Sequence, residues 1–144
     1  FDQTRENLLF RGAAIAALAD WLSANGYSVQ VDAIRYLTNF GKESRGQALS
    51  VLPVKASNAP LDIGNIATAL CEIAFSRKII LCGMVVNANC SVAPSLGAAR
   101  DLPDHLMVDL GYQITAPYSV DSESKALEWV EHAIAKFALP EEKE

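Results

Sequence analysis

A long helix that is apolar on nearly every side opens the sequence. Its central stretch and the residues that follow, "RGAAIAALADWLSANGYSVQV" (residues 11–31), hold few polar positions within the helix, mainly Arg11 and Asp20. The pattern predicts a helix over residues 4–25, and Gly26 can end it because glycine readily takes the left-handed conformation. A helix with so little polar surface must be packed on more than one side. The rest of the chain therefore has to enclose this helix.

Length and composition point to one globular domain. The 144 residues are enough for a single core, and 51% of them are hydrophobic and 20% charged. A net charge of -5 argues against a nucleic-acid partner, because binding to phosphates calls for a clustered basic surface. No stretch has the length and purity of a membrane span or the pattern of a secretory signal. We expect one domain over residues 1–138 and a solvated tail over residues 139–144.

The three cysteines favour a reducing compartment. Cys71, Cys82 and Cys90 are odd in number and lack paired spacing, so they are not a disulfide framework. Cys71 and Cys82 lie in apolar runs, where free cysteine usually serves as a small core residue. We therefore expect a cytoplasmic protein.

A hairpin is expected after the first helix. Residues 27–39 alternate between apolar and polar side chains, as a strand does, and the polar residues 40–46 are bounded by glycines. Residues 47–55 then form the returning strand. Pro53 cannot donate a hydrogen bond to a neighbouring strand, so this strand is expected at the edge of the sheet.

The second half of the chain alternates helices with apolar segments. The expected elements are a loop at 57–62, a helix to about Arg77, a strand at 78–86, a loop at 87–104 with one short helix, a strand at 105–114 and a last helix at about 122–138. The run "KIILCGMVV" (78–86) has no alternation, which is typical of a strand buried on both faces of a parallel sheet. The order predicts a three-layer α/β domain with a mostly parallel sheet and an antiparallel edge hairpin.

The last helix has a start signal and an apolar face. Asp121 is the expected N-cap, since a carboxylate can accept hydrogen bonds from the first free backbone N–H groups. Six apolar residues at helical spacing are expected to face the core: Ala126, Leu127, Val130, Ala133, Ile134 and Phe137.

This order of elements resembles a von Willebrand factor A-type (VWA) domain without its first strand. The residues that carry the resemblance are "LLFRGAAIAALADWLS" (8–23), "APLDIGNIATALCEIAFSRKI" (59–79) and "DSESKALEWVEHAI" (121–134). They are also similar to an uncharacterised family of VWA-like proteins often encoded by bacteriophages and prophages. The resemblance implies a VWA-like α/β fold whose first strand is missing from this chain, which would be the C-terminal part of a longer one.

The VWA resemblance also implies a metal site whose ligands can be checked. Metal-binding VWA domains use Asp-x-Ser-x-Ser after the first strand, a Thr before the second main helix and an Asp after the next strand, all suited to a hard cation such as magnesium. Here the first element is absent, Ala59 or Pro60 stands at the Thr position, and residues 82–84 stand at the Asp position. The resemblance therefore implies a degenerate metal-ion-dependent adhesion site, with no metal and no cofactor. Asp62 could contribute an oxygen from the neighbouring loop, but capping of the following helix is the better interpretation.

Other chemistry has weaker signals. Cys90 lies with Asn87 and Asn89 just beyond a predicted buried strand, where ligands bind in open α/β sheets. A nucleophile–base pair of Cys90 with His105 stays open, although no spacing requires it and a loop cysteine without a role is the better interpretation. In "SLGAAR", Arg100 could meet an anion at a helix N-terminus, but a short surface helix is the simpler interpretation.

The missing strand leads to a binding hypothesis. Without it, the sheet would expose backbone donors and acceptors beside residues 78–86. A protein partner, or an upstream segment of the same polypeptide, is expected to complete the sheet by adding a strand, and a homo-oligomer is left open. The residues expected to face the partner or ligand are Asn58, Asp62, Asn87, Asn89, Cys90 and Arg100.

The sequence thus favours a non-catalytic protein-interaction or assembly domain of a phage or bacterial protein. The alternative is an enzyme whose catalytic residues lie partly upstream of Phe1, with Cys90 as a loop nucleophile or Asp62 as an acid. A large apolar or strand-pairing interface would favour the first interpretation. A bound metal, or a pocket lined by Cys90 and His105, would favour the second.

Overall fold

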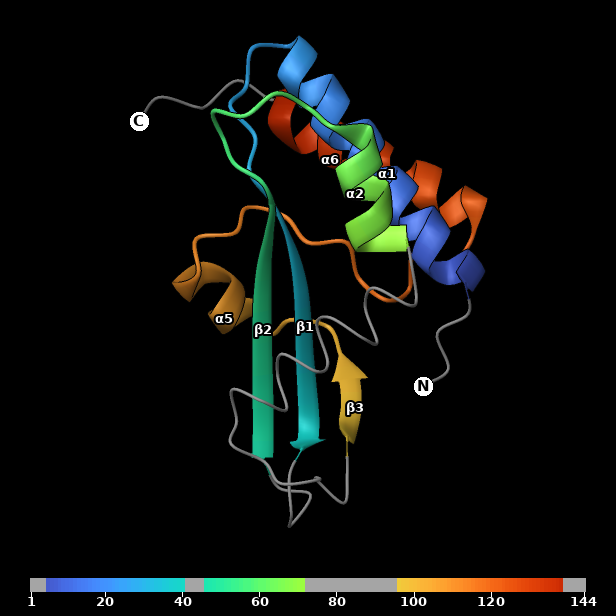
Figure 1. The fold of residues 1–144 in the computed structure, drawn as a ribbon. Coiled ribbons are helices and arrows are strands. Elements are labelled where there is room, and N and C mark those ends of the chain that lie inside the picture. Colours follow the sequence, from blue (N-terminus) through green and yellow to red (C-terminus); the bar gives the residue numbers. More distant parts are fainter. Residues whose placement is uncertain (1–4, 41–45, 72–95, 139–144) are drawn as a thin grey trace.

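The computed structural model describes residues 5–40, 46–71 and 96–138. The elements in chain order are α1 (Arg5–Ala24), β1 (Val31–Phe40), β2 (Gly46–Lys55), α2 (Ile63–Cys71), β3 (Leu96–Arg100), α5 (Asp104–Asp109) and α6 (Glu123–Ala138). Helices α1, α2 and α6 gather at one end, and the strands extend away from them (Figure 1). The predicted strand at 78–86 lies outside the described residues.

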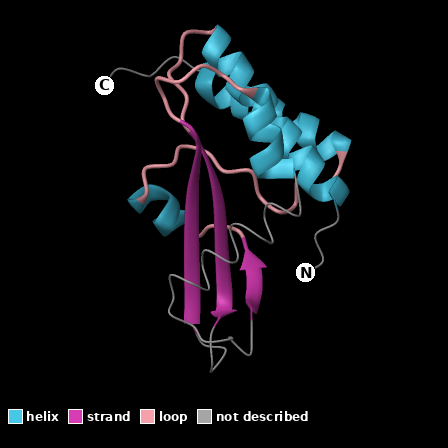
Figure 2. Ribbon diagram, in the orientation of Figure 1, coloured by secondary structure: helices cyan, strands magenta, loops and turns pink. Residues whose placement is uncertain are grey.

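The described strands form one antiparallel sheet in the order β2-β1-β3 (Figure 2). β1 and β2 make a hairpin in which Tyr36 lies opposite Leu49 and Ile34 opposite Val51. β3 pairs only with the second half of β1, where Arg100 lies opposite Tyr36. The hairpin confirms the prediction made from the alternation, and among the described strands β2 lies at an edge, as its proline predicted.

The predicted three-layer, mostly parallel, VWA-like sheet is wrong. Every pairing between described strands is antiparallel. Two segments also form the opposite element from the one predicted. The stretch at 96–100 was expected to hold a short helix but forms β3, because pairing with β1 outweighs the helix propensity of its alanines. The stretch at 105–114 was expected to be a strand, but most of α5 lies within it.

A glycine explains why α5 is short. Gly111 has a φ of 75°, and its N–H donates to the carbonyl of Val108 at 3.0 Å. The N–H of Tyr112 donates to the carbonyl of Met107 at 2.9 Å. These two bonds around a left-handed glycine are the Schellman ending of a helix. The apolar residues before Gly111 therefore belong to a helical turn and not to an extended strand.

Helix α1 ends in the same way, as its glycine predicts. Gly26 has a φ of 84°, the N–H of Gly26 donates to Ser23, and the N–H of Tyr27 donates to Leu22. α1 packs against both α2 and α6. The prediction that this helix needs cover on more than one side is therefore confirmed, but two helices supply most of that cover in place of a sheet.

The two later long helices start at capping residues. Asp62 caps α2, because its Oδ1 accepts a hydrogen bond from the N–H of Asn65 at 3.0 Å, as the capping interpretation predicted. At α6 the predicted cap is wrong by one residue. The N–H of Lys125 donates to Ser122 Oγ at 3.4 Å, whereas Asp121 pairs with the Lys125 ammonium at 2.7 Å. Ser122 fits the backbone better, since the helix begins at Glu123.

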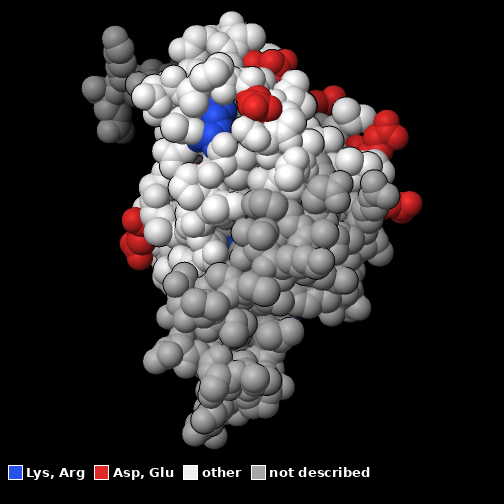
Figure 3. Space-filling model, viewed as in Figure 1, with Lys and Arg blue, Asp and Glu red and all other residues white. Residues whose placement is uncertain are grey.

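The core lies along α1, β1 and the inner face of α6. In β1, Ala33 and Leu37 are buried on one face and Tyr36 on the other. Ala126 and Ala133 of α6 are buried as predicted, but Leu127 is 60% exposed, so its place in the predicted core stripe is wrong. On the face of the molecule in Figure 3, the charged side chains of the described residues are mainly acidic.

Leu37→Ala should lower the free energy of unfolding by about 2–5 kcal/mol, because Leu37 is 0% exposed and the change leaves a cavity in the central strand. The same change at Leu127 should lower it by less than about 0.5 kcal/mol, because that side chain is mostly in water. Urea unfolding followed by circular dichroism measures both values. Equal losses for the two variants would contradict this placement of the core.

Candidate functional site

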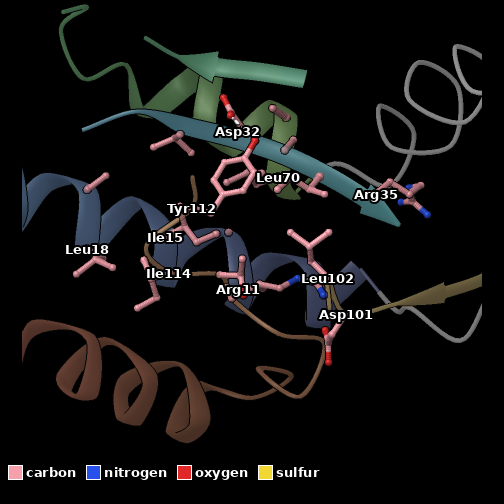
Figure 4. Close-up of a pocket in the computed structure, with 18 of the residues that line it drawn as sticks. Arg11, Ile15, Leu18, Asp32, Arg35, Leu70, Asp101, Leu102, Tyr112 and Ile114 are labelled. Carbon is pink, nitrogen blue, oxygen red and sulfur yellow. Dashed lines mark hydrogen bonds between the residues drawn. The ribbon is translucent and has the colours of Figure 1, made fainter. Parts of the chain in front are cut away.

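A cavity of about 210 Å³ lies between α1 and β1. One stripe of α1, with residues spaced by three or four, lines it: Leu8, Arg11, Gly12, Ile15, Leu18, Ala19 and Leu22. The start of β1 forms the opposite wall, and α2 contributes Ala69 and Leu70. The remaining described lining comes from Arg100–Leu102, the stretch 112–118 and Trp129 of α6 (Figure 4). The lining is thus mostly apolar, with a few polar side chains.

One polar group of the cavity is centred on Asp32. The phenol of Tyr112 donates a hydrogen bond of 2.6 Å to Asp32 Oδ2, and the Gln30 amide donates to both carboxylate oxygens at 3.0 and 3.2 Å. Tyr112 follows the Gly111 turn, which brings its side chain between β1 and α1 (Figure 4). Burial raises the pKa of the Tyr112 phenol, and the hydrogen bond and the charge of Asp32 raise it further. The phenol therefore stays a donor at neutral pH.

A second polar group is centred on Arg11. Its guanidinium lies over the ring of Tyr118, with the guanidinium carbon 4.4 Å from the ring centroid. The N–H of Tyr118 donates to Asp101 Oδ1 at 2.7 Å, which fixes that carboxylate beside the same loop. Burial lowers the pKa of Arg11, Tyr118 and Asp101 act in the opposite direction, and the positive charge of Arg35 lowers it further.

Two further arginines line the cavity. Arg35 comes from β1 and is only 6% exposed, and Arg100 comes from the end of β3. Arg11 and Arg35 lie close enough for the charge of one to affect the other. Arginine stays protonated in proteins, so Arg35 carries a buried positive charge, whereas Arg100 is exposed.

Side-chain hydrogen bonds hold the loop wall of the cavity. α5 has no buried residue to anchor it. The hydroxyl of Thr115 lies 3.8 Å from the sulfur of Met107, the indole of Trp129 donates to the Thr115 carbonyl at 3.2 Å, and Lys136 donates to the Gln113 carbonyl at 3.0 Å. Ile114 of the wall also packs against the apolar cluster of Leu18, Leu22 and Ala133, so polar and apolar contacts together attach the wall to α1 and α6.

The structure brings one of the six predicted site residues to the cavity. Arg100 lines it from the carboxyl end of β3. Asn58 and Asp62 are exposed in and beside the β2–α2 loop and are not among the described lining residues. Asn87, Asn89 and Cys90 lie outside the described residues, so the predicted roles of the six in binding, and of Cys90 or Asp62 in catalysis, stay predictions. His105, expected to open a strand, is an exposed residue of α5.

The described residues show neither a metal-binding cluster nor a membrane-spanning helix. Among the residues that the structure describes, no three His, Cys, Asp or Glu side chains are grouped so that they could hold a metal ion. No helix within the described ranges has both the length and the apolar character needed to cross a membrane.

Most polar residues of the cavity were missed from the sequence. Arg100 was predicted as a site residue, and Arg11 gave a signal as one of the few polar residues in an apolar helix. Asp32, Arg35, Tyr112 and Tyr118 look like ordinary strand or loop residues until the fold brings them together.

The fold and the cavity define a small domain in which a group of helices and an antiparallel sheet enclose a mostly apolar site. The chain belongs to the family described as "Domain of unknown function (DUF7192)", whose model matches residues 2–141. No curated protein and no solved structure matches it. The expected membership of a VWA-like phage family is therefore wrong, since the family match and the antiparallel sheet both differ from it.

Tyr112→Phe should lower the free energy of unfolding at pH 7 by about 1.5–3 kcal/mol, because it removes a hydrogen bond to a charged carboxylate. Since the pKa of Tyr112 is raised in the folded state, this contribution is complete below the ordinary tyrosine pKa of about 10 and declines as the pH rises above it. Urea unfolding at several pH values between neutral and strongly alkaline measures the difference between the wild type and the variant.

The matched control is Tyr27→Phe, whose phenol donates to the neutral carbonyl of Phe137 at 3.0 Å in an exposed position. Its loss at pH 7 should be about 1 kcal/mol or less. A Tyr112→Phe loss no larger than that of the control, or a difference that grows at alkaline pH, would show that the Asp32 contact is not formed.

Proposed function

We propose that this chain is a small-molecule-binding domain whose ligand occupies the cavity between α1 and β1. The observation that carries the proposal is the cavity itself. At about 210 Å³ it exceeds the engineered cavity of roughly 150 Å³ that takes up benzene. Ligand sites are typically apolar with a few converging polar groups, and the cavity has this composition.

The size of the cavity limits the ligand. Ile15 and Leu18 from α1, Leu70 from α2 and Ile114 from the loop wall supply apolar surface from separate elements. The cavity volume suits a ligand with one aromatic ring and a small substituent, or a bicyclic ligand such as indole. Burial of such a body on several sides is favourable at about 25 cal/mol per Å² of apolar surface removed from water.

The test is an NMR titration of the ¹⁵N-labelled chain with toluene, indole and phenylacetate at millimolar concentration. At least one compound should shift the amide signals of α1 and β1 residues that line the cavity. Ile15→Trp should abolish these shifts, because the larger side chain fills the cavity. Ala17→Trp should leave them unchanged, because residue 17 is on the exposed side of the same helix.

Circular dichroism checks that each variant folds. If Ile15→Trp unfolds, Ala69→Phe fills the cavity from α2 instead. The proposal fails if none of the three compounds shifts these amides, or if binding is undiminished in a folded variant whose cavity is filled.

A second candidate function, the protein-interaction or assembly role expected from the sequence, is favoured by the outer part of the sheet. Leu49 is 39% and Val51 38% exposed, and their alternate positions put them on one face of the edge strand β2. Edge strands with apolar side chains readily receive an added strand, although Pro53 limits the pairing. The partner that this face suits is a second copy of the chain. We also propose a cytoplasmic location, which was predicted from the cysteines.

Sedimentation velocity at increasing protein concentration tests the second candidate. The wild type should form dimers at high micromolar concentration, and Val51→Lys should stay monomeric because a charge replaces an apolar contact. Ile63→Lys is the control, since Ile63 is a similarly apolar exposed residue on α2. A wild type that is monomeric throughout, or a Val51→Lys variant that still dimerises, would exclude this interface.

A further inference from the structure

We propose that residues 102–112 form a flap over the cavity, and that the hydrogen bond from Tyr112 to Asp32 is the latch that keeps the flap closed. The flap is the outer part of the loop wall and contains α5. Its role as a gate for ligands rests on the small-molecule-binding function proposed above. Three features support the proposal: the low burial of the flap, the anchors on either side of it, and the position of the latch.

The flap has little apolar packing of its own. None of its residues is buried, and Val108 and Leu110 are 72% and 42% exposed. Within residues 102–112, Leu102 and Tyr112 line the cavity, and they stand at the two ends of the flap. Segments with few buried apolar contacts open locally while the rest of a domain stays folded. The flap is therefore able to open without the separation of α1 from β1.

The chain on both sides of the flap is anchored. Before the flap, Asp101 Oδ1 accepts a hydrogen bond from the N–H of Tyr118 at 2.7 Å, which ties the start of the loop wall to its end. After the flap, the Gln113 carbonyl accepts from Lys136 of α6 at 3.0 Å, and Ile114 packs against an apolar cluster of α1 and α6. Movement is thus confined to the chain between these anchors, as it is in loops that close over binding sites.

A strong contact joins the end of the flap to β1. The Tyr112 phenol donates to Asp32 Oδ2 at 2.6 Å in a partly buried position, and Gln30 donates to both oxygens of the same carboxylate. The contact of the Thr115 hydroxyl with the Met107 sulfur at 3.8 Å is weaker, because a thioether is a poor acceptor. A hydrogen bond to a charged group shifts an equilibrium by roughly tenfold to a hundredfold. The bond to Asp32 therefore strongly favours the closed flap.

The latch lies where its opening uncovers the cavity. In Figure 4 the Tyr112 side chain lies between β1 and α1 and is directed toward Asp32. When the flap opens, this ring leaves the lining, and the space between the two elements becomes accessible from solvent. When the flap closes, the ring returns and excludes water from the site.

Amide hydrogen exchange followed by NMR tests the latch without any ligand. The hydrogen-bonded amides of Met107, Leu110, Gly111 and Tyr112 report on the flap, and amides in the middle of α1 and β1 report on the core. In the wild type the flap amides should be protected, but at least about tenfold less than the core amides. Tyr112→Phe should speed exchange of the flap amides by about tenfold or more, because it removes a bond made only when the flap is closed.

The matched control is Tyr27→Phe, which removes the same hydroxyl from a hydrogen bond to Phe137 outside the flap. It should change exchange of the flap amides by less than about twofold, because these amides exchange through local opening. Asp32→Ala removes the acceptor of the latch and should act as Tyr112→Phe does, so it replaces that variant if Tyr112→Phe does not fold. In the double variant the two effects should not multiply, since both changes remove one bond.

Several results would overturn the latch. One is a wild-type flap whose amides are as well protected as those of the core, or are not protected at all. Another is exchange of the flap amides that is the same in Tyr112→Phe as in Tyr27→Phe. A third is a double variant in which the two effects multiply, because Tyr112 and Asp32 would then act independently.

Ligand kinetics test the flap as a gate, with whichever of toluene, indole and phenylacetate binds. Tyr112→Phe should raise the association and dissociation rates together by about threefold or more and keep the dissociation constant within about twofold, because the closed state stays dominant. NMR line shapes during the titration measure these quantities. Weaker binding with an unchanged association rate would make Tyr112 a ligand contact and overturn the gate. If no compound binds, the small-molecule function fails, whereas the exchange rates still decide the latch.

Discussion

The apolar surface of α1 is the constraint on which the rest of the structure depends. α2 and α6 pack against this helix, and a further side, the stripe from Leu8 to Leu22, lines the cavity. The connection from α1 to β1 is fixed at both ends. Tyr27 donates to Phe137 of α6, and the buried Lys55 of β2 donates to the Val29 carbonyl at 2.7 Å. These contacts attach the connection to α6 and to the sheet. They hold α1 apart from β1, so the cavity between the two elements stays open.

The two sides of the cavity are built differently. α1 and β1 form two walls of the cavity. Both are regular elements, held in place by backbone hydrogen bonds and buried side chains. The wall from Asp101 to Tyr118 contains one short helix without buried residues, and the contacts with Asp32, Arg11 and Trp129 hold it in place. Segments with few buried apolar contacts open at lower free energy than the core does. We therefore expect the loop wall to open at a lower free energy than that needed to separate α1 from the other helices.

Local signals account for the parts of the fold that the sequence predicted. Three such signals are the Gly26 stop, the alternation of β1 and the apolar spacing of α6. Each depends only on residues that are close together in the chain, so each can be recognised in the sequence. β3 depends on its pairing with β1, which is distant in the chain, and its small residues suit a helix as well. The Gly111 ending of α5 was a local signal that was overlooked. Most of the site could not be predicted, because Arg11, Asp32 and Tyr118 come to line one cavity only through the packing of three separate segments.

The net charge of the chain and the charges that line the cavity act over different distances. At physiological salt, exposed charges are screened beyond about 8 Å, so the acidic surface repels a small anion only weakly. Between groups shielded from water and a few ångströms apart, the same charge has a much larger effect. The net charge of -5 argues against an extended polyanion such as nucleic acid more than against a single carboxylate. The charge of any ligand of the cavity is therefore decided by the residues within reach of it and not by the net charge of the chain.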